Sequence, residues 1–249
     1  MLGLRLVSDL RSYYRGSRNR DPAEFYDLES SLPYFDNVGR ILCAHKRRIL
    51  VRWIERERFR GPILELGGGI GTFARDLGRR GYQVVSIDVS PAKTKKARQL
   101  TAKKFPEDPE RVRHISGDLR ELSNGSGFGE ALRRELGLDR LEFDVVVAAD
   151  VLEHLPDTPD DTMATVSPLV SKTGRLFASV PSVFCLNDPG HLWKLLPEDW
   201  EMTFADAGFQ IDGRKMSRVC WYGLPTPLPL AMVYELRASG RCPQKNTER

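Results

Sequence analysis

The chain has few cysteines, and their spacing forms no motif. No Cys-x-x-Cys pair occurs in the 249 residues, which argues against a zinc ribbon and against a thioredoxin-like redox pair. We therefore expect free thiols in a reducing compartment. The four cysteines are Cys43, Cys185, Cys220 and Cys242.

Long apolar segments are also lacking. No run approaches the roughly 20 residues that a membrane-spanning helix needs. The first ten residues carry Arg5 and Asp9 where a signal peptide has an uncharged core. There is no internal repeat and no low-complexity block. These absences predict a cytoplasmic protein without a membrane partner, and they leave its oligomeric state open.

The composition is that of a globular protein. Hydrophobic residues make up 41% and charged residues 29%, and 249 residues suit one elaborated domain better than two. The formal net charge of +4 permits an anionic partner but does not require one.

From residue 61 onward, short apolar runs alternate with amphipathic segments. This alternation is typical of a mostly parallel sheet with helices on both faces. We predict an α/β fold: a doubly wound, mostly parallel seven-stranded sheet with a C-terminal antiparallel strand and an N-terminal helical extension. The expected strands are Ile63–Leu66, Gln83–Ile87, Val112–Ile115, Phe143–Ala148, Arg175–Val180, Phe209–Val219 and Leu230–Leu236. The expected helices of this part are Thr72–Arg80, Ala92–Lys104, Phe128–Leu136, Thr158–Val170 and Pro197–Ala207.

A glycine-rich turn joins the first predicted strand to the following helix. Gly67, Gly69 and Gly71 come directly after a strand that contains Glu65. Glycines leave room for a ligand against the main chain, and the N–H groups of a helix start can bind an anionic group. The turn alone is a weak signal, because many glycine-rich turns bind nothing.

Acidic residues also follow the next two predicted strands. Asp88 ends the second strand, about 20 residues after the turn, where a carboxylate can accept hydrogen bonds from both hydroxyls of a ribose. Asp118 and Leu119 follow the third strand. Since the carboxyl ends of parallel strands meet at one edge of the sheet, we expect a nucleoside site there.

Together these residues resemble class I (Rossmann-like) S-adenosylmethionine-dependent methyltransferases, in particular the ubiquinone/menaquinone-biosynthesis type. The resemblance extends roughly over Gly61–Leu236. It implies S-adenosyl-L-methionine as the cofactor, with its methionine part at Glu65 and the glycine turn, its ribose at Asp88 and its adenine at Asp118. The implied cofactor-binding residues are Glu65, Gly67, Gly69, Gly71, Asp88, Asp118, Leu119 and Asp150.

A nicotinamide dehydrogenase is the competing interpretation of the turn. The stretch Gly69–Ala74 satisfies the G-x-G-x-x-A dinucleotide pattern. Glu65 opposes this interpretation, because a carboxylate beside a pyrophosphate carries an electrostatic cost.

The resemblance continues after the fourth strand, in the Leu-Glu-His segment Leu152–His154. We take His154 as the first catalytic candidate, as a base or as a group that orients the acceptor. His191, in the loop before helix Pro197–Ala207, is the second. The alternative is that His154 only bonds a neighbouring loop. We expect a small-molecule acceptor, with O-methylation favoured and N- or C-methylation left open.

A metal-assisted reaction is a further alternative. Asp150, Glu153, His154 and His191 resemble the metal site of small-RNA 3′-terminal 2′-O-methyltransferases, although Asp150 replaces the first glutamate. Such groups can bind a divalent ion that lowers the pKa of an acceptor hydroxyl, and the basic segment Lys46–Arg60 can contact phosphate. No aromatic-rich basic stretch marks a nucleic-acid groove. We therefore assign no metal ligand and expect no nucleic acid, with a catalytically silent binding module as a third possibility.

We predict three regions: an N-terminal helical lid or extension in residues 1–60, the S-adenosylmethionine-binding domain in residues 61–237, and a flexible tail in residues 238–249. Helices are expected at Leu2–Tyr14 and Val38–Arg58. Aromatic residues are concentrated before residue 36, and the resemblance implies a lid that closes over the acceptor. Plain packing on the sheet explains them equally well. They are Tyr13, Tyr14, Phe25, Tyr26, Tyr34 and Phe35.

Overall fold

The computed structural model describes most of the chain from residue 44 to residue 239. The described residues are 23–24, 26–27, 44–57, 59, 61–122, 125, 127–181, 191–217, 220–221, 224–225 and 231–239. The predicted helix Leu2–Tyr14, the aromatic residues before residue 36 other than Tyr26, and most of the predicted tail lie outside them.

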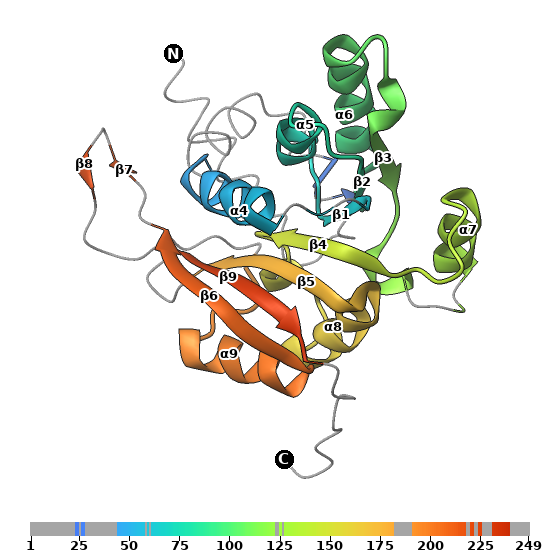
Figure 1. The fold of residues 1–249 in the computed structure, drawn as a ribbon. Helices are drawn as coiled ribbons and strands as arrows, with labels where there is room; N and C mark the ends of the chain where they lie inside the picture. Colours follow the sequence, from blue (N-terminus) through green and yellow to red (C-terminus); the bar gives the residue numbers. More distant parts are fainter. Residues whose placement is uncertain are drawn as a thin grey trace.

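Seven strands form one sheet in the order β3-β2-β1-β4-β5-β9-β6 (Figure 1). β9 runs antiparallel to both β5 and β6, and the remaining neighbours in the sheet are parallel. This arrangement confirms the predicted fold class. The strands are β1 Ile63–Leu66, β2 Val84–Asp88, β3 Val112–Ser116, β4 Phe143–Ala149, β5 Val170–Pro181, β6 Phe209–Ser217 and β9 Ala231–Ala238. A separate pair consists of β7 Cys220–Trp221 and β8 Leu224–Pro225.

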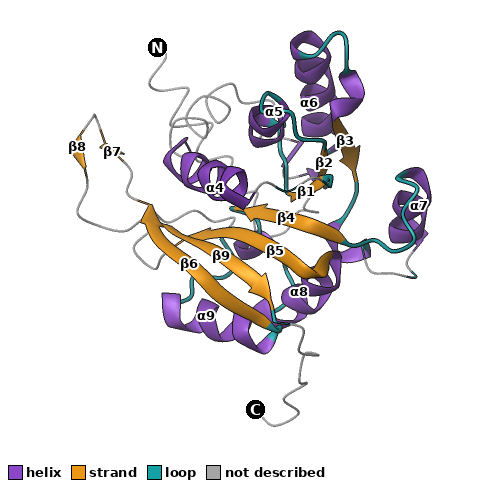
Figure 2. Ribbon diagram, in the orientation of Figure 1, coloured by secondary structure: helices purple, strands orange, loops and turns teal. Residues whose placement is uncertain are grey.

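Helices cover both faces of the sheet (Figure 2). α4 Ala44–Glu57 and α5 Thr72–Gly78 contribute to one hydrophobic cluster, and α6 Pro91–Lys104 contacts β2 and β3. Three further helices contribute to the other cluster, namely α7 Gly127–Glu135, α8 Pro159–Val166 and α9 Pro197–Asp206.

The central strands are buried on both sides. In β4, Val145 and Val147 join the cluster with α4 and α5, whereas Val146 between them joins the cluster with α8 and α9. Successive side chains of a strand point to opposite faces, so both parities must be apolar when both faces are covered. The near-continuous valine run of this strand follows from that burial.

The predicted helix Thr158–Val170 is too long. α8 ends at Val166, a short turn spans Ser167–Leu169, and β5 begins at Val170. Pro168 gives the physical reason, because proline inside a helix removes a backbone hydrogen bond and clashes with the preceding turn. The chain therefore enters β5 several residues before the predicted start at Arg175.

Helix α4 lies close to β9, the last strand among the described residues. Ile49, Leu50 and Trp53 of α4 are buried in the core, and the guanidinium of Arg56 donates to both carboxylate oxygens of Glu235 on β9 at 2.6 and 2.7 Å. Glu235 is 1% exposed. α4 is thus a layer of the folded core as well as part of the predicted N-terminal extension.

No helix within the described ranges combines the length and the apolar character that a bilayer span requires.

Candidate active site

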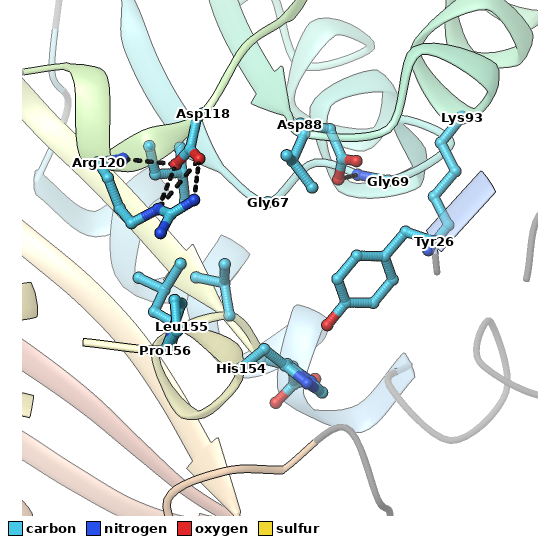
Figure 3. Close-up of a pocket in the computed structure, with 14 residues that line it drawn as sticks. Tyr26, Gly67, Gly69, Asp88, Lys93, Asp118, Arg120, His154, Leu155 and Pro156 are labelled. Atoms are coloured by element: carbon cyan, nitrogen blue, oxygen red, sulfur yellow. Dashed lines mark hydrogen bonds and ion pairs between the residues drawn. The ribbon is translucent and has the colours of Figure 1, made fainter. Parts of the chain in front are cut away.

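A cavity of about 220 Å³ lies at the carboxyl ends of the central strands (Figure 3). The structure brings most of the predicted site residues together around it, although they come from separate strand ends. Six of the eight implied cofactor-binding residues line the cavity, and so does His154. The six are Gly67, Gly69, Asp88, Asp118, Leu119 and Asp150.

Two glycines of the turn, Gly67 and Gly69, have different structural roles. Gly67 has a φ of 65°, and a Cβ atom there would lie 2.6 Å from Cγ2 of Val151. Gly69 has a φ of 54°, and a Cβ atom there would meet nothing within 4 Å. Gly67 therefore permits close packing under the loop, whereas Gly69 leaves open space beside the cavity for a ligand.

Asp88, at the end of β2, holds two backbone segments in place. Its Oδ2 atom accepts a hydrogen bond from the N–H of Gly69 at 2.7 Å, and its Oδ1 atom accepts one from the N–H of Ser90 at 2.9 Å. A carboxylate oxygen has more than one acceptor site. The same side chain can therefore shape the glycine turn and still accept hydroxyl hydrogen bonds from a ribose.

Asp118 lines the cavity next to Arg120, as Figure 3 shows. Its carboxylate accepts hydrogen bonds from the backbone N–H of Arg120 at 2.9 Å and from the guanidinium at 2.6 Å. Partial burial raises the pKa of Asp118, but the hydrogen bonds from Arg120 outweigh it and hold the pKa below its usual value. A ligand amino group at Asp118 would share this anion with Arg120.

Glu65 and Gly71 do not line the cavity. Glu65 is 3% exposed and accepts a hydrogen bond from the hydroxyl of Ser86 at 2.6 Å. Burial raises its pKa to about 7. A Cβ atom on Gly71 would lie 2.3 Å from Cε1 of His114, so this glycine permits close packing. All four residues of β1 are buried, so the alternation of its side chains gives no sequence signal that Glu65 lies away from the cavity.

Asp150 follows β4 with a φ of 58°, the left-handed region that aspartate tolerates better than most residues. Its carboxylate accepts a hydrogen bond from the hydroxyl of Ser179 at 2.8 Å and forms an ion pair with Lys46 of α4. The sequence places Lys46 only on a basic helix face, and nothing in its pattern indicates this contact with the site.

The two catalytic candidates lie next to each other. His154 lines the cavity, and the ring of His191 packs against its ring at a centroid distance of 4.8 Å. His191 itself is set back from the cavity lining. Glu153 lies against both, with its Oε1 atom 4.0 Å from Nε2 of each histidine. The two histidines come together because the chain returns to this point after β5.

Tyr26 closes one side of the cavity, with its hydroxyl end toward His154 in Figure 3. The two rings meet edge to face at a centroid distance of 6.0 Å. The neighbouring Asp27 accepts hydrogen bonds from the hydroxyl of Ser90 and from the N–H of Ala92 at the start of α6. The aromatic content of the N-terminal segment predicts a wall residue of this kind but cannot single out Tyr26.

Comparison with known proteins places this geometry in a family. A methyltransferase-domain family model matches residues 35–221. A ubiquinone biosynthesis O-methyltransferase of Xanthomonas euvesicatoria is 29% identical over 142 residues, covering 55% of the chain but only 52% of that protein. The corresponding protein of Acinetobacter baylyi is 23% identical over 228 residues, covering 89% and 82%. The chain thus spans about half the length of the first of these relatives.

Solved structures with the same fold have lower sequence identity. Magnesium protoporphyrin IX methyltransferase from Synechocystis PCC 6803, crystallised with S-adenosylhomocysteine, has a TM-score of 0.57 at 18% identity and covers 94% of each chain. The glycopeptide N-methyltransferase MtfA, crystallised with sinefungin, has a TM-score of 0.57 at 14% identity, covering 76% and 85%. The family model matches most of the chain, the solved structures share its fold, and residues that suit a nucleoside lie at its strand ends. The chain is therefore a member of the class I S-adenosylmethionine-dependent methyltransferases.

Proposed function

We propose that the chain transfers the methyl group of S-adenosylmethionine to a hydroxyl oxygen of a small molecule. One observation carries this proposal: His154 and Tyr26 border the same cavity as the strand-end residues expected to hold the cofactor. A methyl donor that lies along Asp118, Asp88 and Gly67 would then direct its methyl group to a space that an acceptor can enter.

The residues of the cavity suit the parts of the cofactor. The adenine would lie beside Asp118 and Leu119, and the ribose hydroxyls would bond Asp88. The methionine part would lie over the positive-φ glycines Gly67 and Gly69, with Asp150 nearby. The cofactor supplies an activated methyl group on a positively charged sulfur atom, and this chain's own residues position it.

The reaction needs orientation more than elaborate catalysis. An in-line displacement gains most from holding the acceptor oxygen against the methyl carbon with water excluded. His154 is 18% exposed and is the imidazole placed to take the acceptor's proton. Tyr26 would cover the reacting atoms from the opposite side, which excludes water at that point.

A small acceptor is favoured over RNA by the basic residues of α4. Lys46 is paired with Asp150, Arg47 with Asp76 and Arg56 with Glu235. These three side chains make contacts within the protein, while Arg48 and Arg52 are exposed; the helix therefore offers a phosphate fewer cations than its sequence suggests. O-methylation is the favoured reaction because the curated relatives are O-methyltransferases by name.

A transfer assay with labelled cofactor tests the proposal. We expect methylated product from hydroxyl-bearing small molecules and none from RNA oligonucleotides. His154→Gln should lower kcat about 100-fold or more and leave the affinity for S-adenosylhomocysteine close to wild type. His45→Gln, which changes an exposed histidine of α4, is the matched control and should keep full activity.

Two outcomes would contradict the proposal. Methylation of RNA in preference to small acceptors would assign the site to a macromolecular substrate. Tight cofactor binding without S-adenosylhomocysteine release, across a broad acceptor panel, would favour a binding module that does not turn over.

A further inference from the structure

Three side chains converge beside the cavity, and none of them is among the residues expected to bind the cofactor. Glu153 and His154 belong to the short helical turn Leu152–His154, and His191 lies ahead of α9. Their ligand-type atoms all lie within 4.8 Å of one another. The two distances of 4.0 Å between Glu153 Oε1 and the histidine Nε2 atoms exceed hydrogen-bond length. They suit instead groups that surround a common ion.

The spacing needs only a small contraction to bind an ion. Bonds of about 2.0–2.2 Å in a tetrahedral site place neighbouring ligand atoms roughly 3.3–3.6 Å apart. Side-chain rotations within the cluster can supply that difference. The Glu153 side chain is 1% exposed, and a cation at the centre of the cluster would interact favourably with its buried carboxylate.

The backbone around the cluster is fixed. The carbonyl oxygen of Glu153 accepts hydrogen bonds from the N–H of Leu192 at 2.8 Å and from the N–H of Trp193 at 3.2 Å. The indole N–H of Trp193 donates to the carbonyl oxygen of Leu155 at 2.9 Å. The segment that carries His191 is therefore bound to the turn that carries Glu153 and His154. Supported side chains of this kind are what a metal site requires.

Asp150 does not complete the cluster. Its carboxylate is directed to Ser179 and Lys46, which leaves one carboxylate and two imidazoles as the donor set among the described residues. Mg²⁺ and Ca²⁺ prefer oxygen ligands, whereas two imidazoles with a carboxylate suit Zn²⁺, Mn²⁺, Fe²⁺ or Co²⁺. Three protein ligands leave at least one coordination position open.

We propose that Glu153, His154 and His191 form a binding site for a divalent transition-metal ion whose open position takes an oxygen of the methyl acceptor. His154 borders both the cluster and the cavity, so an ion held by it would face the acceptor. The role of the ion in catalysis rests on the proposed function, whereas the metal site itself does not. With the ion bound, the metal replaces the imidazole of His154 as the group that activates the acceptor hydroxyl, and His154 serves as a metal ligand rather than as the proton acceptor.

The chemistry balances without a further reagent. The ion lowers the pKa of the bound acceptor hydroxyl, and its proton passes to solvent. The oxygen lone pair forms the new bond to the methyl carbon as the carbon–sulfur bond breaks. The bonding electrons go to sulfur, which becomes the neutral thioether of S-adenosylhomocysteine. The acceptor class is thus a molecule whose reacting oxygen can coordinate a metal ion.

Titration of the tag-free, chelator-treated protein with Co²⁺ tests the site without any acceptor. Calorimetry should give one ion per chain, and visible absorption should show the d–d bands of Co²⁺ with nitrogen and oxygen ligands. Glu153→Gln and His191→Ala should each weaken Co²⁺ binding at least about tenfold. His45→Ala removes an exposed histidine outside the cluster and should bind Co²⁺ as the wild type does.

S-adenosylhomocysteine affinity, measured on the same samples, reports separately on the cofactor site and on folding. If Glu153→Gln does not fold, His191→Ala decides the question, because His191 does not line the cofactor cavity. Wild-type Co²⁺ affinity in a folded His191→Ala protein would overturn the proposal, as would a loss of binding in His45→Ala. Co²⁺ binding without S-adenosylhomocysteine binding would leave the metal site standing and refute the proposed function.

Discussion

The ammonium group of Lys46 on α4 forms an ion pair with the carboxylate of Asp150 at the end of β4. The two side chains are 14% and 24% exposed, so solvent screens the pair only in part. Lys46 thereby neutralises an anion that lines the cavity, and it connects α4 to the candidate site.

Replacing Lys46 with methionine should destabilise the protein, because Asp150 would keep its charge without its cation. We expect a loss of about 1–3 kcal/mol in the free energy of unfolding at neutral pH, measured by urea denaturation. Asp150→Asn keeps a residue that accepts positive φ and should recover part of the loss in the double variant. Strictly additive effects of the two substitutions would show that the pair is not coupled.

Asp88→Ala should weaken S-adenosylhomocysteine binding at least about tenfold. The substitution removes the acceptor for the N–H groups of Gly69 and Ser90 and the carboxylate expected to bond the ribose. Calorimetric titration measures the change. Asp144→Ala is the control, since this aspartate lies near the amino end of β4 and bonds Ser171. An unchanged affinity in Asp88→Ala would contradict the assigned position of the cofactor.

Replacing Gly69 and Gly71 individually with alanine should distinguish an effect on ligand binding from an effect on packing. Gly69→Ala places its methyl group in open space, so we expect weaker cofactor binding and a stability loss of about 1–2 kcal/mol from its positive φ. Gly71→Ala would also collide with His114 and should lose more stability than Gly69→Ala. Thermal melting and calorimetry measure both quantities, and equal melting temperatures for the two variants would refute this division.

Glu65 should make the protein less stable as the pH rises. Its pKa in the folded protein is about 7, above the ordinary value of 4.5, so the folded state binds more protons between these values. Stability is then greatest below about pH 4.5 and declines as the pH rises through 7. The total change is roughly 3 kcal/mol.

Glu65→Gln should remove this dependence, because it keeps an acceptor for Ser86 but carries no charge. The variant should therefore gain stability over the wild type between pH 5 and pH 8, as measured by urea denaturation at several pH values. Burial also lowers the pKa of His114, to about 4. Comparing the two proteins at each pH cancels the contribution of His114, because both contain it. Parallel stability curves for wild type and variant would exclude this role of Glu65.

Local patterns predicted which strand-end residues lie together at the cavity. Asp88 and Asp118 could be placed because each directly follows a short apolar strand, and parallel strands bring their carboxyl ends to one edge. Glu65 was harder to place, since both faces of β1 are covered and the sequence does not show that its side chain is buried away from the cavity.

The part of the candidate site that is expected to bind the acceptor is formed by contacts between residues that are distant in sequence. Nothing near His191 in sequence shows that its segment bonds the carbonyl oxygen of Glu153. The same holds for Lys46, which on a helical projection is one basic residue among several. Contacts of this kind are set by how loops return to the sheet, and hydrophobic periodicity carries no information about that return.

The ion pair between Arg56 and Glu235 constrains how the chain can acquire its structure. During synthesis α4 leaves the ribosome well before β9, so part of its apolar face stays exposed until β9 has been made. A product interrupted before residue 231 would lack the strand between β5 and β6, and Trp53 and Leu50 would lose part of their cover. Such interrupted chains should aggregate, which makes the final strand the step that commits the nascent polypeptide to its native form.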